Sequence, residues 1–328
     1  MTDAHSAVLA VDVGGTTVKG ALVDLTGRPV HEVTAPTFPT AETQVADVVT
    51  AVLTELAELA ARSGRPVVGA GVVTPGIVDE STGRVEFAAN LAWRDFDLRG
   101  HLEQRLAVPV VVGHDVRAAG AAEALLGAAR GSRDLAFVAL GTGIAAALVT
   151  SGSVVTGAGC AAGEIGHMPV YPDGRRCPCG QVGCLEVYAS GAAVARRYAE
   201  LGGPAGRTAE DVVAALGVDP AADQAWDEAV RALALASSTL TLALDPAYIV
   251  LGGGLARAGE RLLAPLRHQL AGLLAWRTPP PLAASQLGQA AGRVGAAMLV
   301  LRRAGQGAVV ERWTAADVLG LPAAEPRS

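Results

Sequence analysis

The residues best suited to chemistry lie close together in one stretch of the chain, Ala162 to Glu186. It holds three of the four cysteines, Cys177, Cys179 and Cys184, which are preceded by His167. Three thiolates and one imidazole form the closed, four-ligand set of a structural zinc ion, which leaves no coordination position for water or substrate. Such a zinc would hold the backbone in place and would take no part in a reaction.

A disulfide is the alternative use of clustered cysteines. One intervening residue strains a bridge between Cys177 and Cys179, and no secretory signal precedes Ala7. Zinc-bound thiols in a cytoplasmic protein are therefore the favoured interpretation. The remaining cysteine, Cys160, fits no motif and is predicted to be a small, buried apolar side chain.

Two carboxylates are interleaved with the predicted metal ligands. Glu164 lies three residues before His167, and Glu186 lies two residues after Cys184. A metal that fixes the backbone here would also orient both glutamates and the outer face of His167 toward a bound ligand.

Glycine-rich turns follow three predicted strands, where the backbone can approach a phosphate or a nucleotide closely. The first turn lies between Asp12 and Lys19 and joins two strands; it contains Gly14, Gly15 and Thr16. The second contains Gly141, Thr142 and Gly143. The third is expected at the start of a helix and contains Gly252 and Gly253.

An aspartate stands at the end of another strand. The apolar run from Val108 to Gly113 is followed by His114 and Asp115, and then by a predicted helix, Val116 to Leu126. Ligand sites in open α/β sheets gather at the carboxyl ends of strands, so Asp115 is a candidate catalytic group. The alternative role is structural, because aspartate is also a common helix N-cap.

Composition limits the class of protein. At 328 residues, with 51% hydrophobic and 18% charged residues, the chain has room for two globular domains. A formal net charge of −6 without a cluster of Lys and Arg argues against nucleic acid as a partner. The apolar runs are short and interrupted, which argues against a membrane-spanning helix.

The motifs together resemble the ROK family of sugar kinases and sugar-responsive repressors. G-E-I-G-H-M followed by C-x-C-G-x-x-G-C-L-E agrees with the family signature in spacing, residue type and order. The resemblance covers Ala7 to Arg303 and implies an actin-like ATPase (ribonuclease H-like) fold with two α/β domains around a cleft. We expect a smaller domain from residues 1–113 and about 293–328, and a larger one from residues 114–292.

The resemblance also implies a role for each motif. Asp115 would be the general base, Asp12 would act through Mg²⁺, and the three glycine turns with Lys19 would hold ATP. The residues expected to bind a hexose are Gly76, Asn90, His114, Asp115, Glu164, His167 and Glu186. The residues expected to bind Zn²⁺ are His167, Cys177, Cys179 and Cys184.

The sequence departs from the family pattern at two places. The usual Asn-Asp-x-Asn reads His114-Asp115-Val116-Arg117, which bears on the identity of the sugar. Ala145 to Ala147 stand where family kinases continue with glycines. Alanine disfavours a positive φ, so the affinity for nucleotide could differ.

The predicted function is ATP-dependent phosphorylation of a hexose, at O6 of glucose, by a cytoplasmic homodimer or homotetramer. Kinases for mannose, allose, N-acetylmannosamine or N-acetylglucosamine remain alternatives, as do a catalytically impaired sugar sensor and polyphosphate in place of ATP. A repressor is disfavoured because only six residues precede Ala7, too few for a winged-helix segment. Trp313 is predicted to fix the C-terminal tail, residues 304–328, to the surface.

Overall fold

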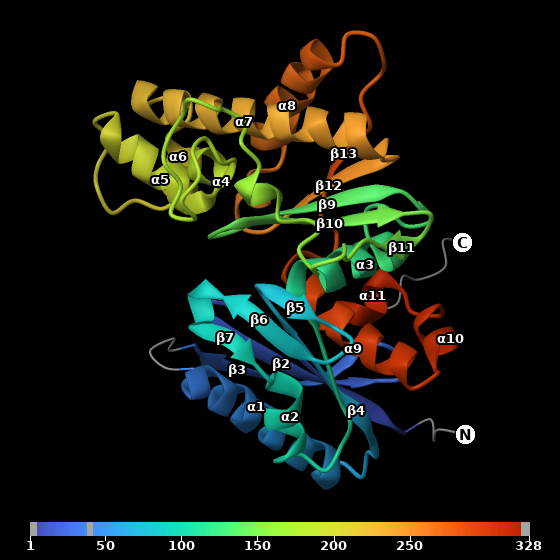
Figure 1. Ribbon diagram of the computed structural model, residues 1–328. Coiled ribbons are helices and arrows are strands. Elements are labelled where there is room, and N and C mark those ends of the chain that lie inside the picture. Colours follow the sequence, from blue (N-terminus) through green and yellow to red (C-terminus); the bar gives the residue numbers. More distant parts are fainter. Residues whose placement is uncertain (1–4, 38–41, 323–328) are drawn as a thin grey trace. The chain divides into compact units, whose positions relative to one another are not determined.

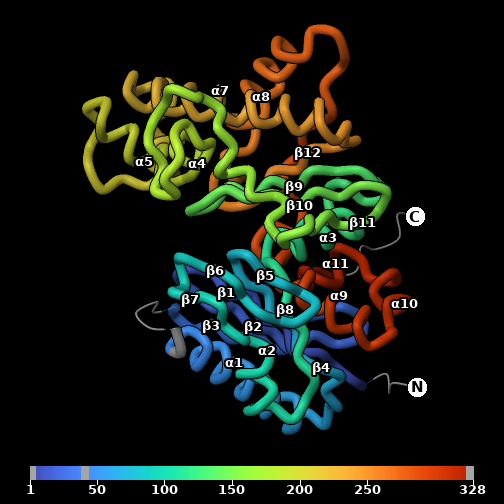
Figure 2. Tube along the Cα trace, viewed as in Figure 1, coloured from blue at the N-terminus to red at the C-terminus, as the bar shows by residue number. Residues whose placement is uncertain are grey.

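The chain forms two compact units, each with its own sheet and core (Figure 1). The computed structural model describes residues 5–37 and 42–322. Unit 1 comprises Met1–Gly127, Thr156–Ala161 and Gln289–Ser328, and unit 2 comprises Ala128–Val155 and Ala162–Gly288. The chain therefore enters unit 1 three times and unit 2 twice. In Figure 2 the N-terminal part (blue) and the C-terminal helices (red) lie in the same unit.

Unit 1 is built on a five-stranded sheet in the order β3-β2-β1-β4-β8. Its strands are β1 (Ala7–Val13), β2 (Thr17–Asp24), β3 (Pro29–Pro36), β4 (Val67–Thr74) and β8 (Val110–His114). The pairs β1–β2 and β2–β3 are antiparallel, and β1, β4 and β8 are parallel. A small antiparallel sheet contains β5 (Ile77–Asp79), β6 (Arg84–Ala88) and β7 (Trp93–Phe96). Every residue of β1 except Asp12 is buried, as expected for a central strand covered on both faces.

Helices cover both faces of the unit 1 sheet (Figure 1). They are η1 (Ala89–Leu91), α1 (Glu42–Arg62), α2 (Leu98–Glu103), α3 (Asp115–Leu126), α9 (Ala291–Arg303), α10 (Gly307–Val310) and α11 (Ala315–Val318). On one face, a Cβ at Gly20 would lie 2.5 Å from Val52 of α1. On the other face, Gly71 lets the backbone of α9 at Ala296 lie directly on β4.

The sheet of unit 2 repeats the strand order and polarity of unit 1. Its order is β11-β10-β9-β12-β13, with β9 (Leu135–Leu140), β10 (Ile144–Thr150), β11 (Ser153–Val154), β12 (Tyr248–Gly252) and β13 (Leu282–Ala284). The strands β9, β10 and β11 are antiparallel neighbours, and β9, β12 and β13 are parallel. The helices are η2 (Ile165–His167), α4 (Glu186–Ala189), α5 (Gly191–Glu200), α6 (Ala209–Ala215), α7 (Pro220–Leu244), η3 (Leu255–Ala258), α8 (Glu260–Leu273) and η4 (Gly288–Ala290), the last at the boundary to unit 1.

The units differ from the expected division at residues 113 and 293. Helix α3, with Asp115 at its start, belongs to unit 1 because it packs on α9. Gly295 permits this contact, since a Cβ there would clash with the backbone of Ala118. Unit 1 therefore extends to Gly127 and resumes at Gln289.

Three local expectations also need correction. Ala145 to Ala147 lie in β10 with extended backbone, paired with Phe137 to Ala139, so no left-handed conformation is demanded of them. The triple glycine after β12 leads into a short 3₁₀ turn, and helix α8 begins only at Glu260. Cys160 is half-buried, not buried, and its φ of 53° places it in the left-handed region.

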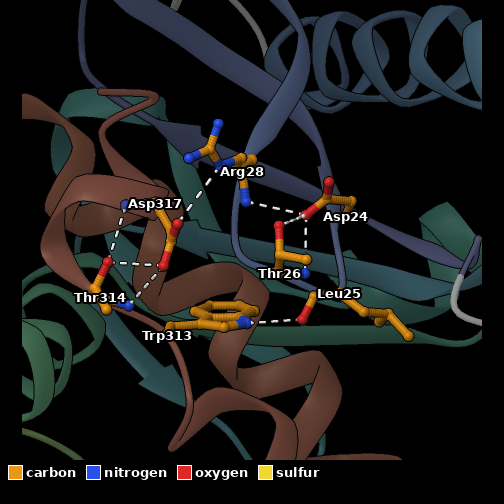
Figure 3. A network of polar contacts seen from close by, with 7 residues as sticks. All are labelled: Asp24, Leu25, Thr26, Arg28, Trp313, Thr314 and Asp317. Atoms are coloured by element: carbon orange, nitrogen blue, oxygen red, sulfur yellow. Dashed lines mark hydrogen bonds and ion pairs between the residues drawn. The ribbon is translucent and has the colours of Figure 1, made fainter. Parts of the chain in front are cut away.

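The C-terminal segment is fixed by Trp313 (Figure 3). This side chain is buried, and its Nε1 donates to the Leu25 carbonyl at 3.0 Å. Its ring packs on Gly27, where an added Cβ would be only 2.8 Å from the ring. Arg28 pairs with Asp317 at 3.4 Å. Among the described residues, no helix has the length and apolar character needed to cross a bilayer.

Candidate active site and metal site

Asp12 and Asp115 lie at the carboxyl ends of two parallel strands of unit 1. In the sheet register Asp12 of β1 pairs with Val73 of β4, and Val73 pairs with Gly113 of β8. Asp12 is therefore level with Gly113, and Asp115 follows Gly113 by two residues. Burial, and then the charge of Asp115, raise the pKa of Asp12 to about 7. Two carboxylates that influence each other in this way can bind a divalent cation or hold a proton.

The first glycine turn connects β1 to β2 and is held by Thr37 at the end of β3. The Thr37 hydroxyl donates to the Gly14 carbonyl at 2.8 Å, and its N–H donates to the Thr16 carbonyl at 2.9 Å. Asn90 lies beside this turn, because a Cβ at Gly15 would be 3.4 Å from Asn90 Nδ2. The structure thus brings the predicted phosphate turn and one predicted hexose ligand together in unit 1.

Residues at the start of α9, which sequence reasoning missed, lie beside Asp12. Gln289 accepts a hydrogen bond from Lys19 Nζ at 2.9 Å. A Cβ at Gly292 would be only 2.5 Å from Asp12 Oδ2. Arg293 is paired with Glu32, and its charge offsets a part of the rise in the Asp12 pKa that burial causes. No motif marks these residues, because their role depends on how α9 returns to β1.

The residues around Asp115 explain the departure from the family pattern. His114 is buried and caps α3, since its Nδ1 accepts from the Arg117 N–H at 3.2 Å. Asp115 Oδ1 accepts from the Val116 N–H at 2.7 Å, and its side chain is 26% exposed. Arg117 is also buried and is paired with Glu80, a residue that the sequence did not single out.

Gly76 has a reason to be glycine that requires no ligand. Its φ is 106°, and a Cβ there would clash with the Phe87 carbonyl and lie 2.8 Å from the Ala88 side chain. Its predicted contact with hexose stays a prediction.

In unit 2 the four predicted metal ligands converge. Their ligand atoms, on His167, Cys177, Cys179 and Cys184, all lie within 4.8 Å of one another. Gly183, with a φ of 79°, allows the chain to fold back tightly against Tyr171 so that Cys184 joins the group. All four cysteines of the chain, which all lie in its described part, are free of disulfides.

This donor set fits a zinc ion. His167 Nδ1 is buried and has no hydrogen-bond partner among the described residues, as expected for a nitrogen that binds a metal. Burial raises the pKa of the Cys184 thiol to about 12, so a cation is needed to hold it as a thiolate at neutral pH. The chemistry of three thiols and one imidazole matches tetrahedral zinc.

The metal loop is also tied to the helices of unit 2. Arg175, two residues before Cys177, donates to Glu228 of α7 at 2.5 Å and stacks over the Tyr188 ring. Arg197 of α5 makes two further bonds to Glu228, at 2.8 and 2.9 Å. The charged network therefore fixes the loop at one point, and a metal on the thiols would fix it at a second.

Glu186 connects the metal stretch to the second glycine turn. Its Oε2 accepts from the Ile144 N–H at 2.9 Å, and a Cβ at Gly143 would be 2.7 Å from the same oxygen. Glu164 is half-buried at the start of η2, and its carbonyl accepts from the His167 N–H at 3.1 Å. Both glutamates thus neighbour the metal ligands or the turn at Gly141 to Gly143.

The third glycine turn is shaped by packing. A Cβ at Gly252 would lie 2.5 Å from the Phe137 ring, and Gly253, with a φ of 83°, lies against the Leu140 backbone. Glycine is required at both positions whether or not a nucleotide binds there.

Known proteins resemble the chain over most of its length. Residues 8–303 match the sequence model of the ROK family. A glucokinase of Streptomyces coelicolor is 32% identical over 314 residues, which cover 89% of this chain and 96% of that enzyme. An N-acetylglucosamine repressor of Escherichia coli O157:H7 is 30% identical over 137 residues, 42% of this chain and 34% of the repressor.

A solved structure agrees with these relationships. The ROK family glucokinase of Streptomyces griseus, in complex with glucose and AMPPNP, is 33% identical with a TM-score of 0.79, covering 90% of this chain and 99% of that one. The two units of this chain accordingly have the predicted actin-like ATPase fold. From the family match and these relatives, we conclude that the chain belongs to the ROK family.

Proposed function

We propose that this protein is an ATP-dependent hexose kinase that phosphorylates O6 of glucose. The observation that carries the proposal is the placement of Asp12 and Asp115 at the ends of parallel strands, where burial and then the charge of Asp115 raise the pKa of Asp12. The similarity to glucokinases over about nine-tenths of the chain supports the same activity.

Asp115 would act as the general base. The O6 oxygen attacks the γ-phosphorus, the bond from that phosphorus to the bridging oxygen of ADP breaks, and the hydroxyl proton passes to the Asp115 carboxylate. Because phosphoryl transfer has a loose transition state, Asp115 contributes mainly by orienting the hydroxyl and accepting its proton late. Its place in the first turn of α3 favours the negative charge that this role requires.

The other groups of unit 1 would handle the phosphates. Asp12 would hold Mg²⁺, which when bound neutralises charge on the transferring phosphoryl group. The backbone of Gly14 to Thr16 and the ammonium of Lys19 would contact phosphate oxygens. In unit 2, the corresponding predictions are nucleotide contacts at Gly141 to Gly143 and at Gly252 and Gly253.

The Cys₃His set of unit 2 would bind Zn²⁺ and hold the sugar ligands in place. His167 and Glu186 would then present fixed polar groups to hexose hydroxyls, with Glu164 beside them. The zinc would supply rigidity to this stretch.

A panel of hexoses tests the proposed function. ADP formation is measured with glucose, mannose, allose, N-acetylmannosamine and N-acetylglucosamine, with ATP or polyphosphate as phosphoryl donor. We expect the highest kcat/KM with glucose and ATP, and loss of turnover in Asp115→Asn. Hexose binding detected by calorimetry without turnover would identify a sugar sensor instead. If the protein neither bound nor phosphorylated any of these hexoses, a role in hexose chemistry would be contradicted. Light scattering in the same buffer tests the proposed homodimer or homotetramer.

One observation keeps a different hexose as second candidate. His114 stands where the family has an asparagine, and its Nδ1 is used as the cap of α3. A ring whose Nδ1 accepts a hydrogen bond while neutral carries its proton on Nε2, so it can only donate there, whereas an asparagine amide can both donate and accept. The hexose panel decides between glucose and a sugar with another pattern of hydroxyl groups.

A further inference from the structure

The two residues that depart from the family pattern, His114 and Arg117, share one partner. Glu80 Oε1 accepts from Arg117 Nε at 2.9 Å and from the His114 N–H at 3.3 Å. Glu80 follows β5, far from the β8–α3 junction in sequence. A single carboxylate thus contacts the residues on both sides of Asp115.

Arg117 is held at every side of its guanidinium. Besides Glu80, it donates to the Val78 carbonyl at 3.0 Å and to the Cys160 carbonyl at 2.9 Å, and its side chain is 3% exposed. Cys160 has a left-handed φ, and Arg117 ties the segment Thr156–Ala161 to unit 1 through this carbonyl. A buried guanidinium that donates from each of its three nitrogens fixes the groups around it in one geometry.

His114 completes the arrangement. Its Nδ1 accepts from the Arg117 backbone N–H, a first-turn donor of α3 that has no acceptor within the helix, and the His114 backbone N–H donates to Glu80. Glu80 therefore holds the backbone of the residue before Asp115 and the side chain of Arg117 after it. The carboxylate of Asp115 is itself bonded to the next N–H of the turn.

We propose that Glu80 and Arg117 are positioning residues for Asp115, which fix the β8–α3 junction so that its carboxylate meets the hexose hydroxyl in a productive orientation. This inference rests on the proposed function, in which Asp115 is the base. A catalytic group must be held within about 0.5 Å of its productive position, and a displacement of about 1 Å can reduce the rate about 10²-fold. Arg117, which is buried and paired with Glu80, stands where the family pattern has its second Asn.

Conservative variants test the proposal without deleting a buried group. Glu80→Gln keeps an acceptor oxygen and removes the charge, and Arg117→Lys keeps the charge and loses most of the hydrogen bonds. The matched controls are Glu58→Gln and Arg62→Lys, which change an exposed ion pair of α1 in the same unit. Each variant is also made in the Asp115→Asn background, and the purified full-length protein is used throughout.

Two readouts separate positioning from simple loss of stability. The first is kcat and KM for hexose and ATP, measured well below each variant's melting temperature. The second is hydrogen–deuterium exchange of the peptide that spans residues 110–119. We expect Glu80→Gln and Arg117→Lys to lower kcat at least about tenfold, with the KM for ATP changed by no more than about twofold. Both variants should accelerate exchange in this peptide. In the Asp115→Asn background, each should lower kcat little further. The controls should change none of these.

Three results would overturn the inference. One is a loss of kcat that is equally large in the Asp115→Asn background, which would show that the pair does not act through Asp115. Another is unchanged kcat with a lowered melting temperature, which would show a purely structural pair. The third is unchanged exchange at residues 110–119. Absence of turnover by the unsubstituted protein with every hexose would contradict the proposed function, and in that case faster exchange in the variants would still identify the pair as what orders this junction.

Discussion

Two regions of the molecule hold proposed hexose ligands in place by different means. At the β8–α3 junction of unit 1, His114 and Asp115 are fixed by the buried Arg117 and its partner Glu80. In unit 2, a metal bound by the Cys₃His set would fix His167, and a hydrogen bond from the Ile144 N–H holds Glu186. Neither region lies in the middle of a regular element.

The difference lies in what each region needs from its surroundings. The junction needs only side chains of the chain itself, so its order should persist in chelators and under oxidising conditions. The proposed metal stretch would need a cation and reduced thiols, because three thiols crowded within 4.8 Å cannot all be ionised otherwise. Disturbing one region should therefore leave the other largely unchanged.

Loss of the metal should have the largest effect. Cys184→Ser removes a buried ligand, and we expect the unfolding free energy to fall by at least about 5 kcal/mol, or the Tm by about 10 °C, together with loss of bound zinc. Cys160→Ser is the control, since this half-buried cysteine lies outside the metal set. Calorimetry measures the Tm of each variant, and metal analysis measures its zinc content. Equal destabilisation by the two variants would contradict a stabilising role of the metal.

The charge at Asp12 should make unit 1 sensitive to pH. Its folded pKa of about 7 exceeds the ordinary value of 3.8, so the folded state binds more protons than the unfolded state between these values. Stability from this group is therefore lost as pH rises toward 7. In Mg²⁺-free buffer, Asp12→Asn should be more stable than the unsubstituted protein at pH 8, by up to about 4 kcal/mol, and nearly equal to it at pH 4. Urea unfolding at the two pH values tests this, and a variant less stable at pH 8 would contradict it.

Removing the proposed base should affect activity and leave the metal stretch intact. Asp115→Asn is expected to lose at least about 10² in kcat, because general-base contributions run about 10²- to 10⁴-fold. The zinc content and the Tm should stay close to those of the unsubstituted protein. Near-full activity would remove Asp115 from the mechanism.

The exposed pair Arg28–Asp317 gives the smallest effect and sharpens the contrast with the buried Arg117–Glu80 pair. Both arginines are ion-paired, but Arg28 is 44% exposed and Arg117 only 3%. Arg28→Gln should lower the free energy of unfolding by less than about 1 kcal/mol, and this difference should disappear at high salt. Thermal unfolding at low and high NaCl measures it. Asp317 is unsuitable for this test because it also caps α11 through Thr314.

The sequence predicted the elements that carry motifs and missed those that depend on distant packing. Cys177, Cys179, Cys184 and His167 were recognisable because ligand type and spacing are local properties. The surroundings of Arg117 were not, because the acceptors of its side chain come from two distant segments, Val78 with Glu80 and Cys160.

The expected domain boundary shows the same limit. The resemblance led us to expect Asp115 in the second domain. Helix α3 belongs instead with α9, which is more than 160 residues later, because Gly295 and Ala118 let their backbones meet. Likewise, alanines that raised doubt about the second glycine turn lie in β10, where an extended backbone suits them.

The return of α9 to unit 1 has a consequence for biosynthesis. During translation, β1, β4 and β8 leave the ribosome long before residues 291–303, so their sheet lacks α9 while all of unit 2 is being made. The bare surface at Gly69 and Gly71, which later receives Ala296 and Val300, would be exposed for that whole interval. Unit 2, whose chain is interrupted only by Thr156–Ala161, can complete its core first, so a nascent chain stalled before α9 should resist protease in unit 2 and be cleaved in unit 1.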